Sequence, residues 1–68
     1  MREVNIKNDV IRLGQLLKLA DLVEAGGDVK ALLAGGAVTV NGEVEVRRGR
    51  QLVRGDTVSS DGVDLRVV

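Results

Sequence analysis

Apolar residues recur in this chain with two different spacings, and the change from one to the other falls near residue 13. In "REVNIK", Val4 and Ile6 alternate with polar neighbours, which predicts a short, half-buried strand at the edge of a sheet. Further on, apolar residues follow at intervals of three and four, which places them on one face of a helix. These residues are Leu13, Leu16, Leu17 and Ala20. The outward face of this helix is formed by Gln15, Lys18 and Asp21.

A second, shorter helix is predicted within "GGDVKALLAGG". Val29, Leu32 and Leu33 repeat the helical spacing, Asp28 suits the N-terminus, and the glycine pair 35–36 suits a left-handed C-terminal cap. Helices of about two turns are too short to be stable alone, so both must pack on each other or on a sheet.

The stretch "AVTVNGEVEV" predicts a β-hairpin. A two-residue loop at "NG" would pair Val38 with Glu45 and so place valines and glutamates on one face. A three-residue loop that ends with Gly42 in the left-handed conformation pairs Val38 with Val44 instead. We therefore expect the three-residue loop, with Glu43 and Glu45 on a solvated strand surface away from the arginines that follow.

The valine-rich remainder of the chain predicts further strands around residues 52–53, 57–59 and 63–68, separated by the turn signals "RGD" and "DG". The expected fold class is α+β: two short packed helices, helix-turn-helix-like, against a small, mainly antiparallel sheet of four to five strands. A length of 68 residues limits the chain to one domain, residues 1–68.

Composition narrows the possible functions. The chain is 44% hydrophobic and has no aromatic residue, so its core must be built from Leu, Val, Ile and Ala. It also lacks Cys and His, the usual soft metal ligands, activated nucleophile and general base, so we expect no enzyme, catalytic residue, metal, cofactor or small-molecule substrate. The absence of cysteine and of any apolar run of roughly 20 residues predicts a cytoplasmic protein without membrane contact.

Charge is segregated along the chain although the formal net charge is zero. The segment 47–54 holds four arginines and no acid, namely Arg47, Arg48, Arg50 and Arg54. A guanidinium group can contact a phosphate through two hydrogen bonds and can stack on an unpaired base. Gly49 would let the strand bulge or approach a ligand closely. The alternative is that "RRGR" is an exposed loop that keeps the protein soluble.

The glycines before the second helix form another candidate anion site. Gly26 and Gly27 would expose backbone N–H groups to a phosphate, and Lys30 lies one turn further along. The alternative is that these glycines only make the turn between the helices. Arg12 and Lys18 are weaker candidates for phosphate contact, as is Arg54.

Several of these elements, in this order, resemble the S4-like RNA-binding domain, or alpha-L motif, named after the fourth protein of the small ribosomal subunit. The resemblance covers residues 13–58 and includes two apolar helices, "G-x-V-x-V-N-G" at residues 36–42 and "G-D-x-V" at residues 55–58. It is strongest to small stand-alone bacterial members, which share "GG-x-x-K" and "RRGR". Many family members carry basic residues where this chain has Gly26 and Ala37, so we expect modest affinity.

The resemblance implies binding of structured RNA, of the ribosomal or transfer RNA class, in ribosome assembly or translation. Its contacts would come from helix two and the hairpin, through Gly26, Gly27, Lys30 and residues 47–50. Four phosphate contacts by Lys30, Arg47, Arg48 and Arg50 would give a slope of log K against log salt of roughly −3 to −4. The alternative is a protein-interaction module whose arginine loop docks on an acidic ribosomal or other protein partner.

Overall fold

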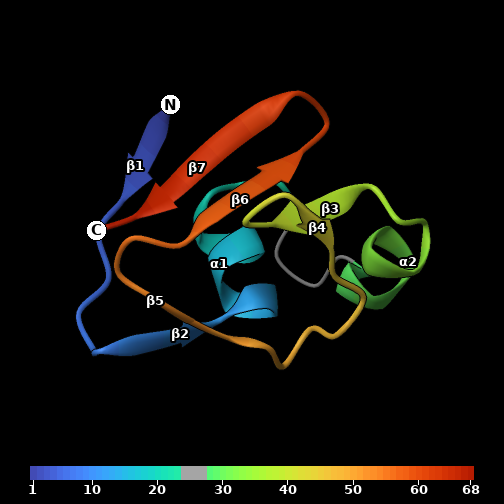
Figure 1. Ribbon diagram of the computed structural model, residues 1–68. Helices are drawn as coiled ribbons and strands as arrows, with labels where there is room; N and C mark the ends of the chain where they lie inside the picture. The colour runs from blue at the N-terminus through green and yellow to red at the C-terminus, as the bar shows by residue number, and fades with distance from the viewer. Residues whose placement is uncertain (24–27) are drawn as a thin grey trace.

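The computed structural model describes residues 1–23 and 28–68, and its elements form an α+β fold, as the sequence predicts (Figure 1). The two helices are α1 (Leu13–Leu19) and α2 (Val29–Ala34). The strands are β1 (Arg2–Val4), β2 (Val10–Arg12), β3 (Val38–Val40), β4 (Glu43–Val44), β5 (Gln51–Val53), β6 (Thr57–Ser60) and β7 (Val63–Val67).

Five of these strands form a mixed sheet with the order β1-β7-β6-β3-β4. The β1 strand runs parallel to β7, and the other neighbours in the sheet are antiparallel. The edge position of β1 is the one that the alternation in "REVNIK" predicts. At the opposite edge, β4 leads directly into the arginine-rich segment.

A second sheet of two antiparallel strands, β2 and β5, was not foreseen. The β2 strand has only three residues, too few to show an alternating pattern. It continues without a loop into α1. This junction fixes where α1 begins, because Arg12 is both the last residue of β2 and the residue that precedes the helix.

Both helices direct the expected apolar residues to the core, although Leu32 of α2 is only partly buried. The four apolar residues of the first helical pattern are at most 1% exposed. In α2, Asp28 caps the N-terminus by accepting a hydrogen bond from the Ala31 N–H at 3.0 Å. The chain leaves α2 through Gly36, whose φ of 74° is in the left-handed region, whereas Gly35 is still right-handed.

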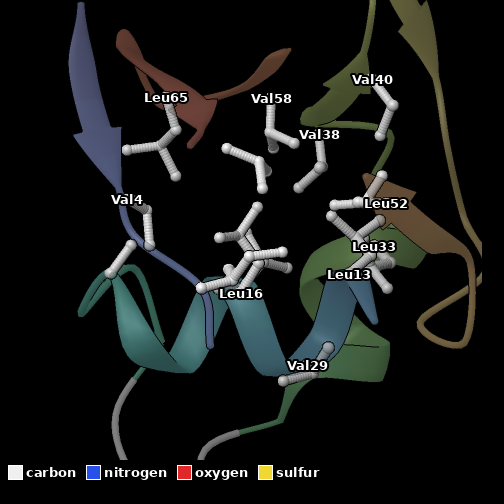
Figure 2. Close-up of a cluster of buried hydrophobic side chains, with 14 residues drawn as sticks. Val4, Leu13, Leu16, Val29, Leu33, Val38, Val40, Leu52, Val58 and Leu65 are labelled. Carbon is white, nitrogen blue, oxygen red and sulfur yellow. The ribbon is translucent and has the colours of Figure 1, made fainter. Parts of the chain in front are cut away.

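The core lies between the five-stranded sheet and the helices, as Figure 2 shows. Side chains of Val4, Val38, Val58 and Leu65 come from the sheet and meet those of α1 and α2. Leu52 of the small sheet is fully buried in the same cluster, so β5 is also fixed to the core.

The register of the β3–β4 hairpin differs from our expectation. Val40 pairs with Glu43 across a two-residue loop, and both loop residues have positive φ, 51° at Asn41 and 86° at Gly42. Two-residue turns with positive φ at both positions are favoured in hairpins, because their backbone twist matches the right-handed twist of the flanking strands. The expected three-residue loop is therefore wrong, and Val44, not Glu45, is the residue exposed to solvent.

Candidate nucleic-acid interface

A groove of about 320 Å³ opens where the start of α1, the start of α2 and the turn of residues 47–50 meet. We call it the basic groove. Its lining residues are Arg12, Gly14, Gln15, Lys18, Asp28, Val29, Arg48 and Gly49. The lining thus includes three basic side chains and a single acidic one, in a chain whose formal net charge is zero.

The three cations reach the basic groove from two parts of the chain. Arg12 precedes α1, and Lys18 lies on its exposed face, six residues further along. Arg48 belongs to the turn of residues 47–50, in which the Arg50 N–H donates to the Arg47 carbonyl at 3.3 Å. Residues far apart in the sequence therefore place three positive charges around one hollow.

The turn of residues 47–50 is fastened directly to the beginning of α1. The N–H groups of Leu13 and Gly14 donate to the carbonyls of Arg50 and Arg48, each at 2.9 Å. The first four N–H groups of a helix have no partner within the helix, and these two bonds satisfy the N–H groups of Leu13 and Gly14. A Cβ at Gly14 would lie 3.4 Å from the Arg48 carbonyl oxygen and 3.5 Å from Val29, so turn and helices meet closely at this residue.

Glu45 is buried, contrary to the expectation that it lies on a solvated surface. Its side chain is 7% exposed, and its carboxylate accepts hydrogen bonds from the side chains of Arg47 and Arg50. The contact with Arg47 uses two nitrogens: Nε to Oε2 at 3.2 Å and Nη2 to Oε1 at 3.0 Å. Arg50 Nη1 adds a bond to Oε1 at 3.1 Å. The observed hairpin register brings Glu45 opposite Val38, where its N–H donates to the Val38 carbonyl. Arg47 and Arg50 neutralise its carboxylate there. Glu43 is exposed, as expected.

These bonds change the acidity of the carboxyl group. The side-chain hydrogen bond from Arg47, followed by the backbone N–H of the same residue, lowers the pKa of Glu45 from 4.5 to about 2. Burial opposes this shift, and the bond from Arg50 reinforces it. The hydrogen bond to Glu45 in turn raises the pKa of Arg47, so the pair stays ionised at neutral pH.

The other residues expected to contact RNA lie in different settings. Arg54 donates to the Ile6 carbonyl at 2.9 Å and is 3.6 Å from the Asp9 carboxylate. Lys30 is exposed on α2, next to Val29 of the groove lining. Gly49 lines the basic groove with open space around its Cα and without a left-handed φ, so neither crowding nor the backbone requires a glycine there.

Gly26 and Gly27 lie outside the described residues. Among the residues that line the basic groove, Arg12 and Lys18 were weaker candidates from the sequence, and Gln15 and Asp28 were not candidates for RNA contact. The helical spacing of residues 12, 15 and 18 could have shown that they share a face, but not that Arg48 faces them.

Within residues 1–23 and 28–68, no helix is long and apolar enough to cross a membrane. The same residues contain no cluster of three or more His, Cys, Asp or Glu side chains that could hold a metal ion.

The chain belongs to the S4 domain family, whose model matches residues 4–68. A Bacillus subtilis protein named "Probable ribosome maturation protein RlbA" is 46% identical over 59 residues, which cover 87% of this chain and 83% of the relative. An Escherichia coli protein named "Putative RNA-binding protein YbcJ" is 40% identical over 62 residues, 91% of this chain and 89% of the relative. The resemblance noted from the sequence motifs is therefore confirmed.

Proposed function

We propose that this protein binds structured RNA, of the ribosomal or transfer RNA class, by holding backbone phosphates in the basic groove. The observation that carries the proposal is the meeting of Arg12, Lys18 and Arg48 around one hollow. The family and the name of the Escherichia coli relative support it, because that name describes an RNA-binding protein.

The chemistry of the three cations suits a phosphate backbone. The planar guanidinium groups of Arg12 and Arg48 can each donate two parallel hydrogen bonds to a phosphate, and the ammonium group of Lys18 acts as a compact charge. Asp28, the acid in the lining, has one carboxylate oxygen engaged in the cap of α2. The groove therefore has a local excess of positive charge, which attracts RNA even though the whole chain is neutral.

Phosphate contacts fix the position of a nucleic acid without reading its sequence. We therefore expect recognition of RNA shape, with any preference for a base arising from unpaired nucleotides that stack on a guanidinium plane. Lys30 remains a proposed contact at the rim of the groove, and Gly26 and Gly27 remain proposed contacts before α2.

A role in ribosome assembly or another step of translation, exercised in the cytoplasm, is the cellular setting that we propose. The name of the Bacillus subtilis relative, a ribosome maturation protein, supports this setting. The family resemblance likewise favours an RNA-binding role over an enzymatic one.

Fluorescence anisotropy of a labelled hairpin of ribosomal RNA, titrated at several salt concentrations, tests the proposal. The groove variant carries Arg12→Gln, Lys18→Gln and Arg48→Gln. The control variant carries Arg2→Gln, Lys7→Gln and Arg66→Gln, three exposed residues that do not line the basic groove. Both variants lose three positive charges, so the location of the lost charges is the only difference in charge between them.

The three groove contacts contribute about −2 to −3 to the slope of log K against log salt, and a contact by Lys30 would add to it. The control variant should keep the native slope, and the groove variant should lose the contribution of the three contacts while still folded by circular dichroism. Equal effects of the two variants would refute the groove as the site. Weak RNA binding together with tight, specific binding of an acidic protein would favour the protein-interaction module instead.

A further inference from the structure

We infer that Glu45 is a positioning residue for RNA binding, and that it divides the arginines of "RRGR" between two roles. Arg47 and Arg50 fasten the turn of residues 47–50 through the Glu45 carboxylate, and Arg48 is the arginine of this turn that contacts phosphate. The inference rests on the proposed function, because it concerns how the basic groove is built.

The first support is the hydrogen bonding of the Glu45 carboxylate. It accepts five bonds, all from residues 46–50. Two of them come from the backbone, from the N–H of Val46 at 3.0 Å and that of Arg47 at 3.2 Å. A carboxylate that only shielded surface charge would not need to bind the backbone, whereas these bonds fix the path of the chain as it leaves β4.

The second support lies on the other side of the turn. The carbonyls of Arg48 and Arg50 accept the bonds from the first N–H groups of α1. Arg50 is thus held at both ends, by its carbonyl to Leu13 and by its guanidinium to Glu45. Arg48 lies between these attachments, and its position in the basic groove follows from them.

The third support is the distribution of charge. Glu45 offsets one of the two positive charges of Arg47 and Arg50. Arg48 has no ion pair with any residue of the described ranges 1–23 and 28–68. Within these ranges no carboxylate is bound to Arg48, whereas a phosphate that approaches Arg47 or Arg50 meets the carboxylate of Glu45, to which both are paired.

The inference predicts an effect opposite in sign to that of simple electrostatics. Glu45→Gln removes a negative charge, which by itself should strengthen binding to RNA. If Glu45 positions Arg48, the same change should weaken binding, because the amide cannot accept all five bonds. We expect a loss of about 5- to 8-fold in affinity at 0.1 M salt, the effect of one lost phosphate contact, with the magnitude of the salt slope reduced by about 0.7 to 0.9.

Glu43→Gln is the matched control. Glu43 lies two residues before Glu45, in β4, is exposed, and makes no ion pair with a residue of the described part of the chain. The substitution Glu43→Gln raises the formal charge by the same single unit as Glu45→Gln. It should leave the affinity for RNA unchanged or up to about twofold tighter. If Glu45→Gln binds as tightly as Glu43→Gln, the positioning role is refuted.

A double-mutant cycle with Arg48→Gln separates positioning from general loss of stability. If Glu45 acts through Arg48, the double variant should bind no more weakly than Arg48→Gln alone, because the contact is already lost. Additive losses would contradict the inference. Circular dichroism under the binding conditions establishes that each variant is folded.

Should Glu45→Gln not fold, Arg47→Gln provides the test, since it leaves Glu45 paired with Arg50. If Arg47 acts only by fastening the turn, adding Arg47→Gln to Arg48→Gln should reduce the salt slope no further than Arg48→Gln alone, and a further reduction would overturn the inferred roles. A native protein without a salt slope would instead refute the proposed function, and the positioning role with it.

Discussion

Gly42 sets the register of the β3–β4 hairpin, and its replacement gives a direct test of how that register is maintained. Its φ is 86°, in the region that L-residues rarely adopt, and no atom lies within 4 Å of the place where a Cβ would be. Gly42→Ala therefore introduces backbone strain without a steric clash. The two-residue loop that would be strained is the one that turns Glu45 towards Arg47 and Arg50.

Gly49→Ala is the matched comparison, because Gly49 is also surrounded by open space but has no left-handed φ. Both substitutions reduce the freedom of the unfolded chain equally, so that contribution cancels in the difference between them. The remaining difference is the cost of placing an L-residue in the left-handed region, about 1–2 kcal/mol. For a domain of this size, that corresponds to about 4–16 °C in Tm.

Thermal unfolding followed by circular dichroism measures the effect. Gly42→Ala should melt below Gly49→Ala by that interval, and Gly42→Asn should recover part of the loss, because Asn tolerates the left-handed region better than Ala. Identical melting temperatures for the two alanine variants would show that the backbone of the hairpin adjusts without cost, and the argument from loop geometry to register would fail.

Leu16→Ala, at a side chain that is fully buried between α1 and the sheet, should lower the free energy of unfolding by about 2–5 kcal/mol in urea denaturation, and a loss below about 1 kcal/mol would contradict the core assignment. Because the folded-state pKa of Glu45 is depressed to about 2, its contribution to stability is complete above pH 4.5 and is lost as the pH falls towards 2. Urea denaturation at several pH values should therefore show a shallower decline over this range for Glu45→Gln than for the native protein, and parallel curves would refute the shift. Asp28→Ala removes the cap of α2 and should cost about 0.5–2 kcal/mol, with Asp28→Asn, which can still accept the bond, closer to the native stability in the same assay.

A protein with no net charge can still carry a local excess of positive charge if several of its acids are engaged in hydrogen bonds or ion pairs. Glu45 binds two arginines, Asp28 caps α2, and Asp56 accepts bonds from the Val53 N–H and the Asn41 side chain. These acids stabilise turns and helix ends. Arg12, Lys18 and Arg48 line the basic groove together, with Asp28 as the single acid of the lining.

The helices and most strands could be predicted because their signals are local. The spacing of Leu13, Leu16 and Leu17 gives α1 its buried face, and the Asp61–Gly62 pair predicts the β6–β7 turn, in which both residues have positive φ. Motifs in a fixed order also indicated the family. By contrast, β2 was missed because a strand of three residues has no measurable period and is stabilised by its pairing with β5.

The hairpin register and the role of Glu45 were predicted wrongly for one physical reason. The two-residue loop was rejected because it places glutamates on the same face as the valines, and an unpaired buried carboxylate is indeed costly. In the structure, Arg47 and Arg50 lie 3.0 and 3.1 Å from the Glu45 carboxylate and neutralise it. Pattern arguments treat each side chain as polar or apolar and do not include ion pairs formed after a turn.

The sequence by itself determined the α+β composition, the apolar faces of both helices, the glycine-containing turns and the likeness to the S4 domain, because each depends on residues close together in the chain. Only the tertiary structure decided which basic residues lie together. Arg48 joins Arg12 and Lys18 because the turn that carries it is hydrogen-bonded to the start of α1, whereas Arg47 and Arg50 are bound to Glu45. The four arginines of the segment 47–54 look nearly equivalent in the sequence. Contacts that only folding creates place them in different electrostatic environments.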